Sequence, residues 1–151
     1  MIARVKRNHD KPAVGSGPAA RFSTTRAAHR DETAQDYVEA IDHLIAAKGE
    51  ARVRDLAGIM GVSHVTVSKI IGRIEAMGLV IATAHHPVRL TPKGRALARR
   101  TRECHETVLA FLRAIGVPPR QAEIDAEGIE HHVSAATIRA MKRLVESMPG
   151  R

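Results

Sequence analysis

The segment at residues 53–80 limits the fold of this chain more than any other, because it holds two amphipathic stretches joined by a tight turn. The first stretch brings Leu56 and Met60 to one face of a short helix. Gly61 then permits a sharp turn, and Ser63 is a suitable N-cap for a second helix. The second helix carries an apolar stripe at helical spacing, formed by Val67, Ile70, Ile71 and Ile74. This pattern predicts a helix-turn-helix.

A small hairpin is predicted directly after this motif. Residues 79–90, LVIATAHHPVRL, form two β-prone runs separated by a polar turn that contains Pro87. An amphipathic helix at about residues 33–48, ended by Gly49, precedes the motif. A helix-turn-helix followed at once by a hairpin is a winged helix, so we expect a winged-helix domain over residues 31–91.

The pattern after residue 91 predicts helices only. Thr91 and Pro92 supply an N-cap and a first-turn proline for a long helix. Three helices are expected, at about residues 92–115 and 120–131 and after Ser134. Because the chain has no Trp, one Tyr and two Phe, its core must be built mainly from aliphatic side chains and Met, which favours packed helices. The predicted fold is therefore mainly α, with an N-terminal winged helix-turn-helix, a small β-hairpin wing and an all-helical domain over residues 92–151.

The net charge of +8 is unevenly distributed along the chain. Residues 1–30 carry seven basic residues against one acid and lack sustained periodicity, so they are expected to form a disordered basic arm. Residues 31–51 carry six acids against one base, whereas residues 52–102 carry ten basic residues against two acids. The helix-turn-helix thus lies in a strongly basic block, which is typical of proteins that bind nucleic acid.

The cysteine count and the hydropathy indicate the compartment. Cys104 is the only cysteine, which excludes an intramolecular disulfide framework and a multi-cysteine zinc site. No apolar stretch reaches the roughly 18 residues needed to span a bilayer, and no apolar region of signal-peptide length follows the basic N-terminus. We therefore expect a cytoplasmic protein that makes no membrane contact.

The second helix of the motif is expected to lie in the major groove, where the polar side chains off its apolar stripe face bases and phosphates. Basic side chains near the wing are expected to reach the DNA backbone. The predicted DNA-binding residues are Ser63, His64, Thr66, Ser68, Lys69, Arg73, Arg89 and Lys93. The alternative is a solvated helical hairpin with exposed cations, but the coincidence of motif and basic block favours double-stranded DNA as the partner.

A second group of residues has the types that bind metal ions. Glu127, Glu130 and His131 are spaced i, i+3 and i+4, which places three ligand-type groups on one helical face. Asp36, Glu39 and His105 are further candidate ligands. Taken alone, Asp36 and Glu39 are most simply part of a solvated acidic face, and His105 is more often a hydrogen-bonded core histidine. If these groups lie together, their carboxylates repel one another unless a cation neutralises them.

Several stretches resemble the manganese-responsive branch of the diphtheria toxin repressor family. They occur in the family's order over about residues 31–146, and they are DYVEAI (36–41), GVSHVTVSKII (61–71), LTPKG (90–94), RECHETVLAFLRAIGV (102–117) and DAEGIEHHVS (125–134). The resemblance implies a homodimeric transcription factor whose winged helix binds palindromic operators and whose C-terminal helices form the dimerisation domain. It also implies a binuclear site with two Mn²⁺ ions per subunit, held by Asp36, Glu39, His105, Glu127, Glu130 and His131.

The ligand chemistry favours the same metal. Four carboxylates and two imidazoles without a thiolate suit Mn²⁺, although the Irving–Williams order allows Zn²⁺, Co²⁺ or Ni²⁺ to bind as well. The resemblance to the family also implies what an iron-responsive member would carry: methionine at the position of Asp36 and cysteine at that of Glu127. This sequence has neither.

The implied function is Mn²⁺-dependent repression of manganese uptake and homeostasis genes. Metal bound between the two domains is expected to hold the two recognition helices of the dimer about one DNA turn, ~34 Å, apart. Three alternatives stay open: an iron-responsive regulator of the same family, a metal-independent winged-helix regulator that senses a small organic effector, and a metallohydrolase. No general base separate from the ligands is evident, so we expect neither enzymatic activity nor a small organic substrate.

Overall fold

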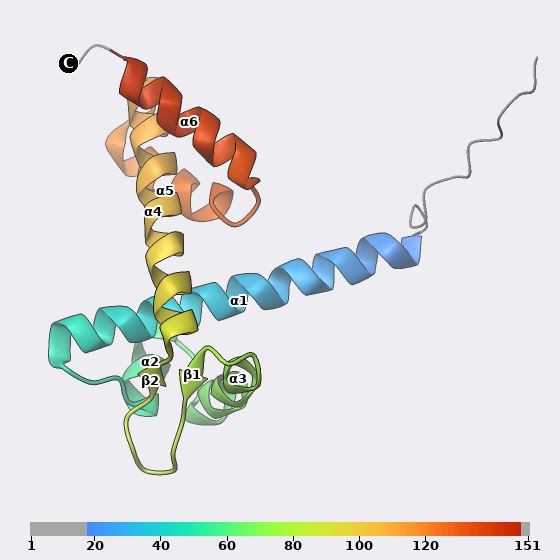
Figure 1. Cartoon of the computed structure of the whole chain (residues 1–151), viewed down its shortest axis with the longest axis vertical. Helices are drawn as coiled ribbons and strands as arrows, with labels where there is room; N and C mark the ends of the chain where they lie inside the picture. The colour runs from blue at the N-terminus through green and yellow to red at the C-terminus, as the bar shows by residue number, and fades with distance from the viewer. Residues whose placement is uncertain (1–17, 149–151) are drawn as a thin grey trace, which may run out of the picture. The chain divides into compact units, whose positions relative to one another are not determined.

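The computed structural model describes residues 18–148, with side chains described from Asp31 onward. Within these residues it contains six helices and one two-stranded sheet, in the order α1 (Pro18–Lys48), α2 (Val53–Met60), α3 (His64–Ala76), β1 (Val80–Ile81), β2 (Arg89–Leu90), α4 (Pro92–Ala114), α5 (Pro119–Ile129) and α6 (Ala135–Ser147) (Figure 1). This confirms the predicted mainly helical fold, in which a winged helix-turn-helix is followed by helices. The chain divides into two compact units, Met1–Asp31 and Glu32–Arg151, and the winged helix and C-terminal helices both belong to the second.

Helix α1 begins much earlier than the sequence predicts. A disordered arm was expected through residue 30, and this expectation is wrong for residues 18–30, which are helical. Four of these thirteen residues are Ala, which has the highest helix propensity, and Pro18 suits a first helical position. Turns added to an existing helix also need no new nucleation. Residues 1–17 of the expected arm lie outside the described residues.

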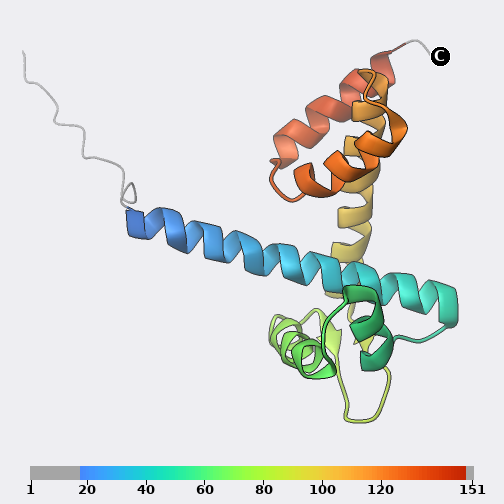
Figure 2. The same cartoon turned by 180° about the vertical axis from the view of Figure 1, so that it is seen from behind.

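The winged helix is built around an aliphatic core to which every one of its elements contributes. The largest fully buried side chains come from α1, α2 and α3, and they include Tyr37, Ile41, Leu56 and Val67. The wing is short: its two strands are antiparallel, with Val80 opposite Leu90. A view from behind shows α2 and α3 beside the wing strands (Figure 2). The apolar stripes seen in the sequence therefore point into this core as predicted.

The turn between α2 and α3 has the expected local chemistry. Gly61 ends α2 in the left-handed conformation, with φ of 64°, which a side chain would disfavour. Ser63 then caps α3, since its hydroxyl accepts a hydrogen bond from the backbone N–H of Thr66. A second glycine fixes where α4 leaves the wing: a Cβ on Gly94 would lie 2.0 Å from the carbonyl oxygen of Leu79.

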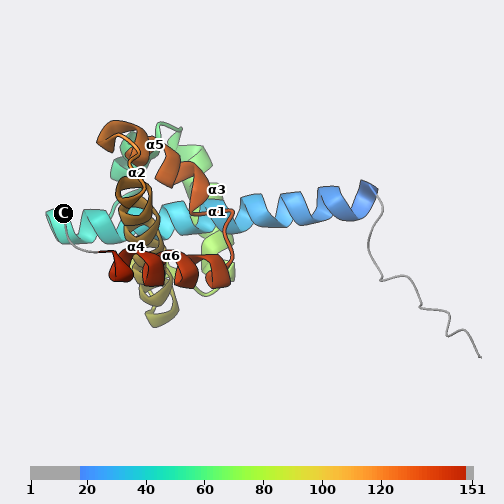
Figure 3. The ribbon, with the colours of Figure 1, turned by 90° about the horizontal axis from the view of Figure 1, so that it is seen from above.

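The C-terminal helices pack around the end of α4. Viewed from above, α5 and α6 both lie beside α4 (Figure 3). A second, smaller core joins α4 to α5 through Val108, Leu112, Ala122 and Ala126. Helix α6 contains no fully buried residue although it is amphipathic, and its Leu144 is 47% exposed. None of the helices between residues 18 and 148 is both long enough and apolar enough to cross a membrane.

Candidate metal centre and nucleic-acid interface

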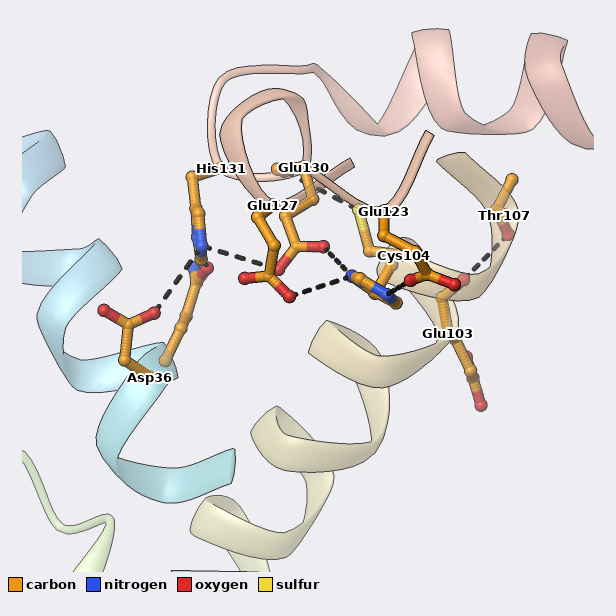
Figure 4. Close-up of polar contacts among 10 residues, drawn as sticks. Asp36, Glu103, Cys104, Thr107, Glu123, Glu127, Glu130 and His131 are labelled. Carbon is orange, nitrogen blue, oxygen red and sulfur yellow. Dashed lines mark hydrogen bonds and ion pairs between the residues drawn. The ribbon is translucent and has the colours of Figure 1, made fainter. Parts of the chain in front are cut away.

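The carboxylate of Glu130 lies at the centre of the candidate metal site. Glu130 is the residue that ends α5, and its side chain is only 4% exposed. One of its oxygens, Oε2, lies 2.6 Å from Nδ1 of His105 on α4. The other, Oε1, lies 3.4 Å from Nε2 of His131 (Figure 4). A buried carboxylate therefore faces two imidazole rings.

His131 extends this cluster to α1. Its ring is 9% exposed, and its Nε2 also lies 3.5 Å from Oδ1 of Asp36. The other ring nitrogen, Nδ1, forms a 3.1 Å hydrogen bond with Oε1 of Gln35. Two neighbouring residues of α1 thus contact a histidine that follows α5, so the winged helix and the C-terminal helices meet at this ring.

The remaining two predicted ligands lie beside the same groups. Glu127, one turn before Glu130 on α5, places Oε1 3.8 Å from Nδ1 of His105 and is itself exposed. Glu39 is half-buried on α1, close enough to interact electrostatically with His105, Glu127 and Asp36. The structure therefore brings all six predicted ligands into one region: Asp36, Glu39, His105, Glu127, Glu130 and His131.

Three of the carboxyl groups are destabilised in their ionised form. Burial raises the pKa of Asp36, of Glu39 and of Glu130 above the ordinary carboxyl range, and the neighbouring histidines only partly oppose this effect. Neighbouring carboxylates raise these pKa values further: Glu32 and then Glu127 act on Asp36, and Glu127 acts on Glu39 and Glu130. Because charge repulsion and desolvation act together, the site favours an added cation.

The donor types fit a divalent metal of the hard class. The atoms available to bind a metal are carboxylate oxygens and imidazole nitrogens. The nearby thiol of Cys104 is engaged elsewhere, because it donates a hydrogen bond to the backbone carbonyl oxygen of Glu130 at 3.6 Å. In the part of the chain that the structure describes, no three His, Cys, Asp or Glu side chains already meet closely enough to hold a metal ion. Five of the six groups form histidine–carboxylate contacts within 4 Å, with Glu39 beside them, and ligation requires their side chains to turn towards a shared ion.

Three contacts at this site were not predicted from the sequence. Gln35 is the partner of His131, and Glu123 places Oε2 3.9 Å from Nε2 of His105. Arg102 of α4 pairs with Asp42 of α1 through a charge-assisted hydrogen bond. One signal in the sequence was available: Gln35 and Glu123 each precede a predicted ligand by four residues, which places them on the same helical face.

The predicted DNA-contacting side chains lie on α3 and its N-cap, on β2 of the wing and at the start of α4. All are exposed: Ser63, His64, Thr66, Ser68, Lys69, Arg73, Arg89 and Lys93. Two of them also have structural roles, because Ser63 caps α3 and the ammonium of Lys93 donates to the backbone carbonyl of Met77 at 2.9 Å. That these side chains contact DNA stays a prediction, supported by their exposure and by the basic character of the segment.

Two family models match this chain. Residues 31–86 match the N-terminal DNA binding domain of the iron dependent repressors. Residues 91–149 match the metal binding and dimerisation domain of the same proteins. The first match covers the second part of α1, α2, α3 and β1, and the second covers α4, α5 and α6.

Curated relatives and solved structures agree with these matches. The transcriptional regulator MntR of Escherichia coli O157:H7 is 46% identical over 121 residues, which cover 80% of this chain and 78% of that protein. The HTH-type transcriptional regulator MntR of Lysinibacillus sphaericus is 39% identical over 114 residues, covering 76% and 82%. A manganese-dependent transcriptional repressor solved in complex with manganese is 29% identical, with a TM-score of 0.64 over 75% of this chain. This chain spans about half of that solved chain, 52% of its length.

Proposed function

The chain belongs to the iron-dependent repressor family, the family of the diphtheria toxin repressor, and on that premise we propose that it is a manganese-dependent repressor of manganese uptake and homeostasis genes. The family consists of DNA-binding regulators with a metal-binding and dimerisation domain, and not of enzymes, so the metallohydrolase alternative is rejected. The observation that carries the proposal is the ring of His131, which contacts Asp36 on α1 and Glu130 at the end of α5.

Manganese is the proposed metal, with two ions per subunit. The donor set supports it, because four carboxylates and two imidazoles without a sulfur donor suit Mn²⁺. A solved relative that is a manganese-dependent repressor supports the same choice. Iron is the second candidate, since the matching family models carry the description iron dependent. We assign the preference for manganese over iron to Asp36 and Glu127.

The residues that hold the metal would connect the two domains. Asp36 and Glu39 are contributed by α1, which forms part of the winged-helix core, whereas His105 lies on α4. Glu130 caps the end of α5, and His131 follows it. When bound, the metal supplies positive charge that offsets the repulsion among the carboxylates. The same side chains then hold the winged helix in one position relative to the dimerisation helices.

This restraint makes DNA binding conditional. In a homodimer, two recognition helices must lie about one DNA turn apart to engage both halves of a palindromic operator. Fixing each winged helix against its own dimerisation domain fixes that spacing, whereas free movement would cost affinity. We place the exposed face of α3, above all His64, Lys69 and Arg73, against the major groove. The effector is a metal ion and no small organic substrate, and the compartment is the cytoplasm.

The proposal is tested by selecting DNA from a random pool with the dimer in the presence of Mn²⁺, and by measuring how tightly the selected DNA is bound with Mn²⁺ or Fe²⁺ under anaerobic conditions. We expect palindromic sequences, with tight binding at lower concentrations of Mn²⁺ than of Fe²⁺. The double variant Asp36→Met, Glu127→Cys should reverse that order. Selection that succeeds equally well in a chelator would overturn the proposal, and a wild-type preference for Fe²⁺ would favour the iron candidate.

A further inference from the structure

The ring of His105 has a carboxylate on each side. On the Nδ1 side lie Glu130, at 2.6 Å, and Glu127, at 3.8 Å. On the Nε2 side lies Glu123, whose Oε2 is 3.9 Å from that nitrogen. Figure 4 shows Glu123 on the opposite side of this cluster from Asp36. Glu123 is not one of the six predicted metal ligands, so its position beside His105 has another explanation.

Glu123 is held in place by a residue of α4. Its second oxygen, Oε1, accepts a 2.6 Å hydrogen bond from Nη2 of Arg113. Arg113 lies in the last turn of α4, and both side chains are about half exposed. An exposed ion pair of this kind adds little to stability. Its effect here is geometric, because it orients the carboxylate of Glu123 towards the ring of His105.

The chemistry of an imidazole ligand explains why a carboxylate on the Nε2 side matters. A neutral ring carries one proton, and a nitrogen that binds a metal cannot carry it. The 2.6 Å contact between Oε2 of Glu130 and Nδ1 of His105 holds one hydrogen, and when Glu130 is ionised that hydrogen is the ring proton on Nδ1. Metal ligands of this type usually donate their other N–H to a carboxylate, which fixes the tautomer and the ring orientation.

We propose that Glu123 is a positioning residue for His105: it accepts the Nε2–H, which leaves Nδ1 free to bind the metal ion, and Arg113 holds Glu123 in that role. The proton balance is simple, because in the neutral ring one proton moves from Nδ1 to Nε2 by exchange with water and none is lost. A shift of about 1 Å brings Glu123 within hydrogen-bond distance of Nε2. The inference rests on the proposed function, since it takes His105 as a metal ligand.

Metal affinity gives the first test. We would titrate the full-length protein with Mn²⁺ and measure free Mn²⁺ by electron paramagnetic resonance. Glu123→Leu should weaken binding about 10-fold, and Glu123→Gln, which keeps an acceptor, should recover part of the loss. The matched control is Glu106→Leu, which removes the same charge from an exposed position of α4 next to His105. Its effect should stay within about 2-fold, as expected for a long-range charge effect alone.

The role of Arg113 is tested in the same titration. Arg113→Leu should weaken Mn²⁺ binding less than Glu123→Leu does, and the double variant should bind no more weakly than Glu123→Leu alone. Such non-additivity is expected if Arg113 acts only through Glu123. Independent, additive losses would overturn this part of the proposal.

The tautomer of His105 gives a readout that a merely structural role would not change. Long-range ¹H–¹⁵N spectra of the protein loaded with diamagnetic Zn²⁺ should show Nε2 protonated in the wild type. Weaker protection of that proton from exchange is expected in Glu123→Leu. A metal-bound Nε2, or a Glu123→Leu variant that binds Mn²⁺ like Glu106→Leu, would overturn the inference and leave the proposed function intact. A wild type that fails to bind Mn²⁺ would overturn both.

Discussion

Oε2 of Glu130 lies 2.6 Å from Nδ1 of His105, and this contact joins the end of α5 to the middle of α4 through an almost completely buried carboxylate. The other oxygen of Glu130 faces His131, whose ring reaches Asp36 on α1. Three helices therefore meet around one acidic group. Because α1 also forms part of the winged-helix core, Glu130 is connected through His131 and Asp36 to the helix that packs against the DNA-binding motif.

The stability of the metal-free protein should depend on the ionisation of Glu130. Burial raises the pKa of this carboxyl, so the folded state keeps the proton to a higher pH than the unfolded state does. The stabilisation is complete below the ordinary carboxyl pKa, about 4.3, and is lost as pH rises through the raised value. We expect the Tm of the metal-free wild type to fall more than that of Glu130→Gln as pH rises above the ordinary carboxyl pKa. An equal fall in both proteins would contradict this account.

Metal binding should stabilise the fold through residues of both domains. At a free Mn²⁺ concentration of about 100 times Kd, a single site contributes about 2.7 kcal/mol, which raises the Tm of a domain of this size by several degrees. Glu39→Ala should remove most of this rise, because it removes a half-buried donor on α1. Glu106→Gln serves as the control with the same loss of charge. A Glu39→Ala variant with the full Tm rise would exclude Glu39 as a ligand.

The sequence predicted the elements whose pattern is local. Apolar residues at helical spacing indicated α2 and α3, Thr91 and Pro92 indicated the start of α4, and the capping roles of Ser63 and Thr91 are present in the structure. The prediction failed at residues 18–30, where a basic composition suggested disorder but a helix continues from α1. The basic charge of residues 18–30 and their lack of an apolar stripe argue against a helix that folds on its own. They do not argue against extending a helix that is already formed by the residues that follow.

The candidate ligands were found by their types and spacing, but their partners were not. Glu130 was expected to lie on the same face as Glu127 and His131, and this follows from helical geometry alone. The contact between Gln35 and His131 joins residues 96 positions apart and depends on how α1 packs against the end of α5. The same is true of the pair formed by Arg102 and Asp42, 60 positions apart. No local pattern contains that information.

The connection between the wing and α4 should tolerate no side chain at Gly94. A Cβ there would lie 2.0 Å from the carbonyl oxygen of Leu79, which is backbone and cannot turn away. We expect Gly94→Ala to lower the free energy of unfolding by about 1–3 kcal/mol, as measured by chemical denaturation. Gly58→Ala is the matched control, because nothing lies within 4 Å of its Cβ and the residue is helical. It should raise stability by about 0.5–1 kcal/mol, and similar effects of both changes would contradict the close approach.

Lys69 should contribute to DNA affinity without affecting the metal. It is exposed on α3, away from the buried stripe that includes Val67 and Ile71. Lys69→Ala should weaken binding to the selected DNA, and, if the contact is to phosphate, reduce the salt dependence of the association constant by about one unit of slope. Lys142→Ala, which removes an exposed cation from α6, should change neither quantity. Unchanged affinity in Lys69→Ala would place the DNA on another surface.

The central claim is that metal held between α1 and the C-terminal helices controls DNA binding, and an operator-binding titration with and without Mn²⁺ tests it most directly. For the wild type we predict that Mn²⁺ tightens binding at least 10-fold, which lies within the usual range of allosteric coupling. Asp36→Ala, which removes a predicted metal ligand and one of the two contacts between α1 and His131, should bind equally weakly in both conditions. Wild-type affinity that is the same with and without Mn²⁺, or an Asp36→Ala variant that keeps the full response, would contradict the account.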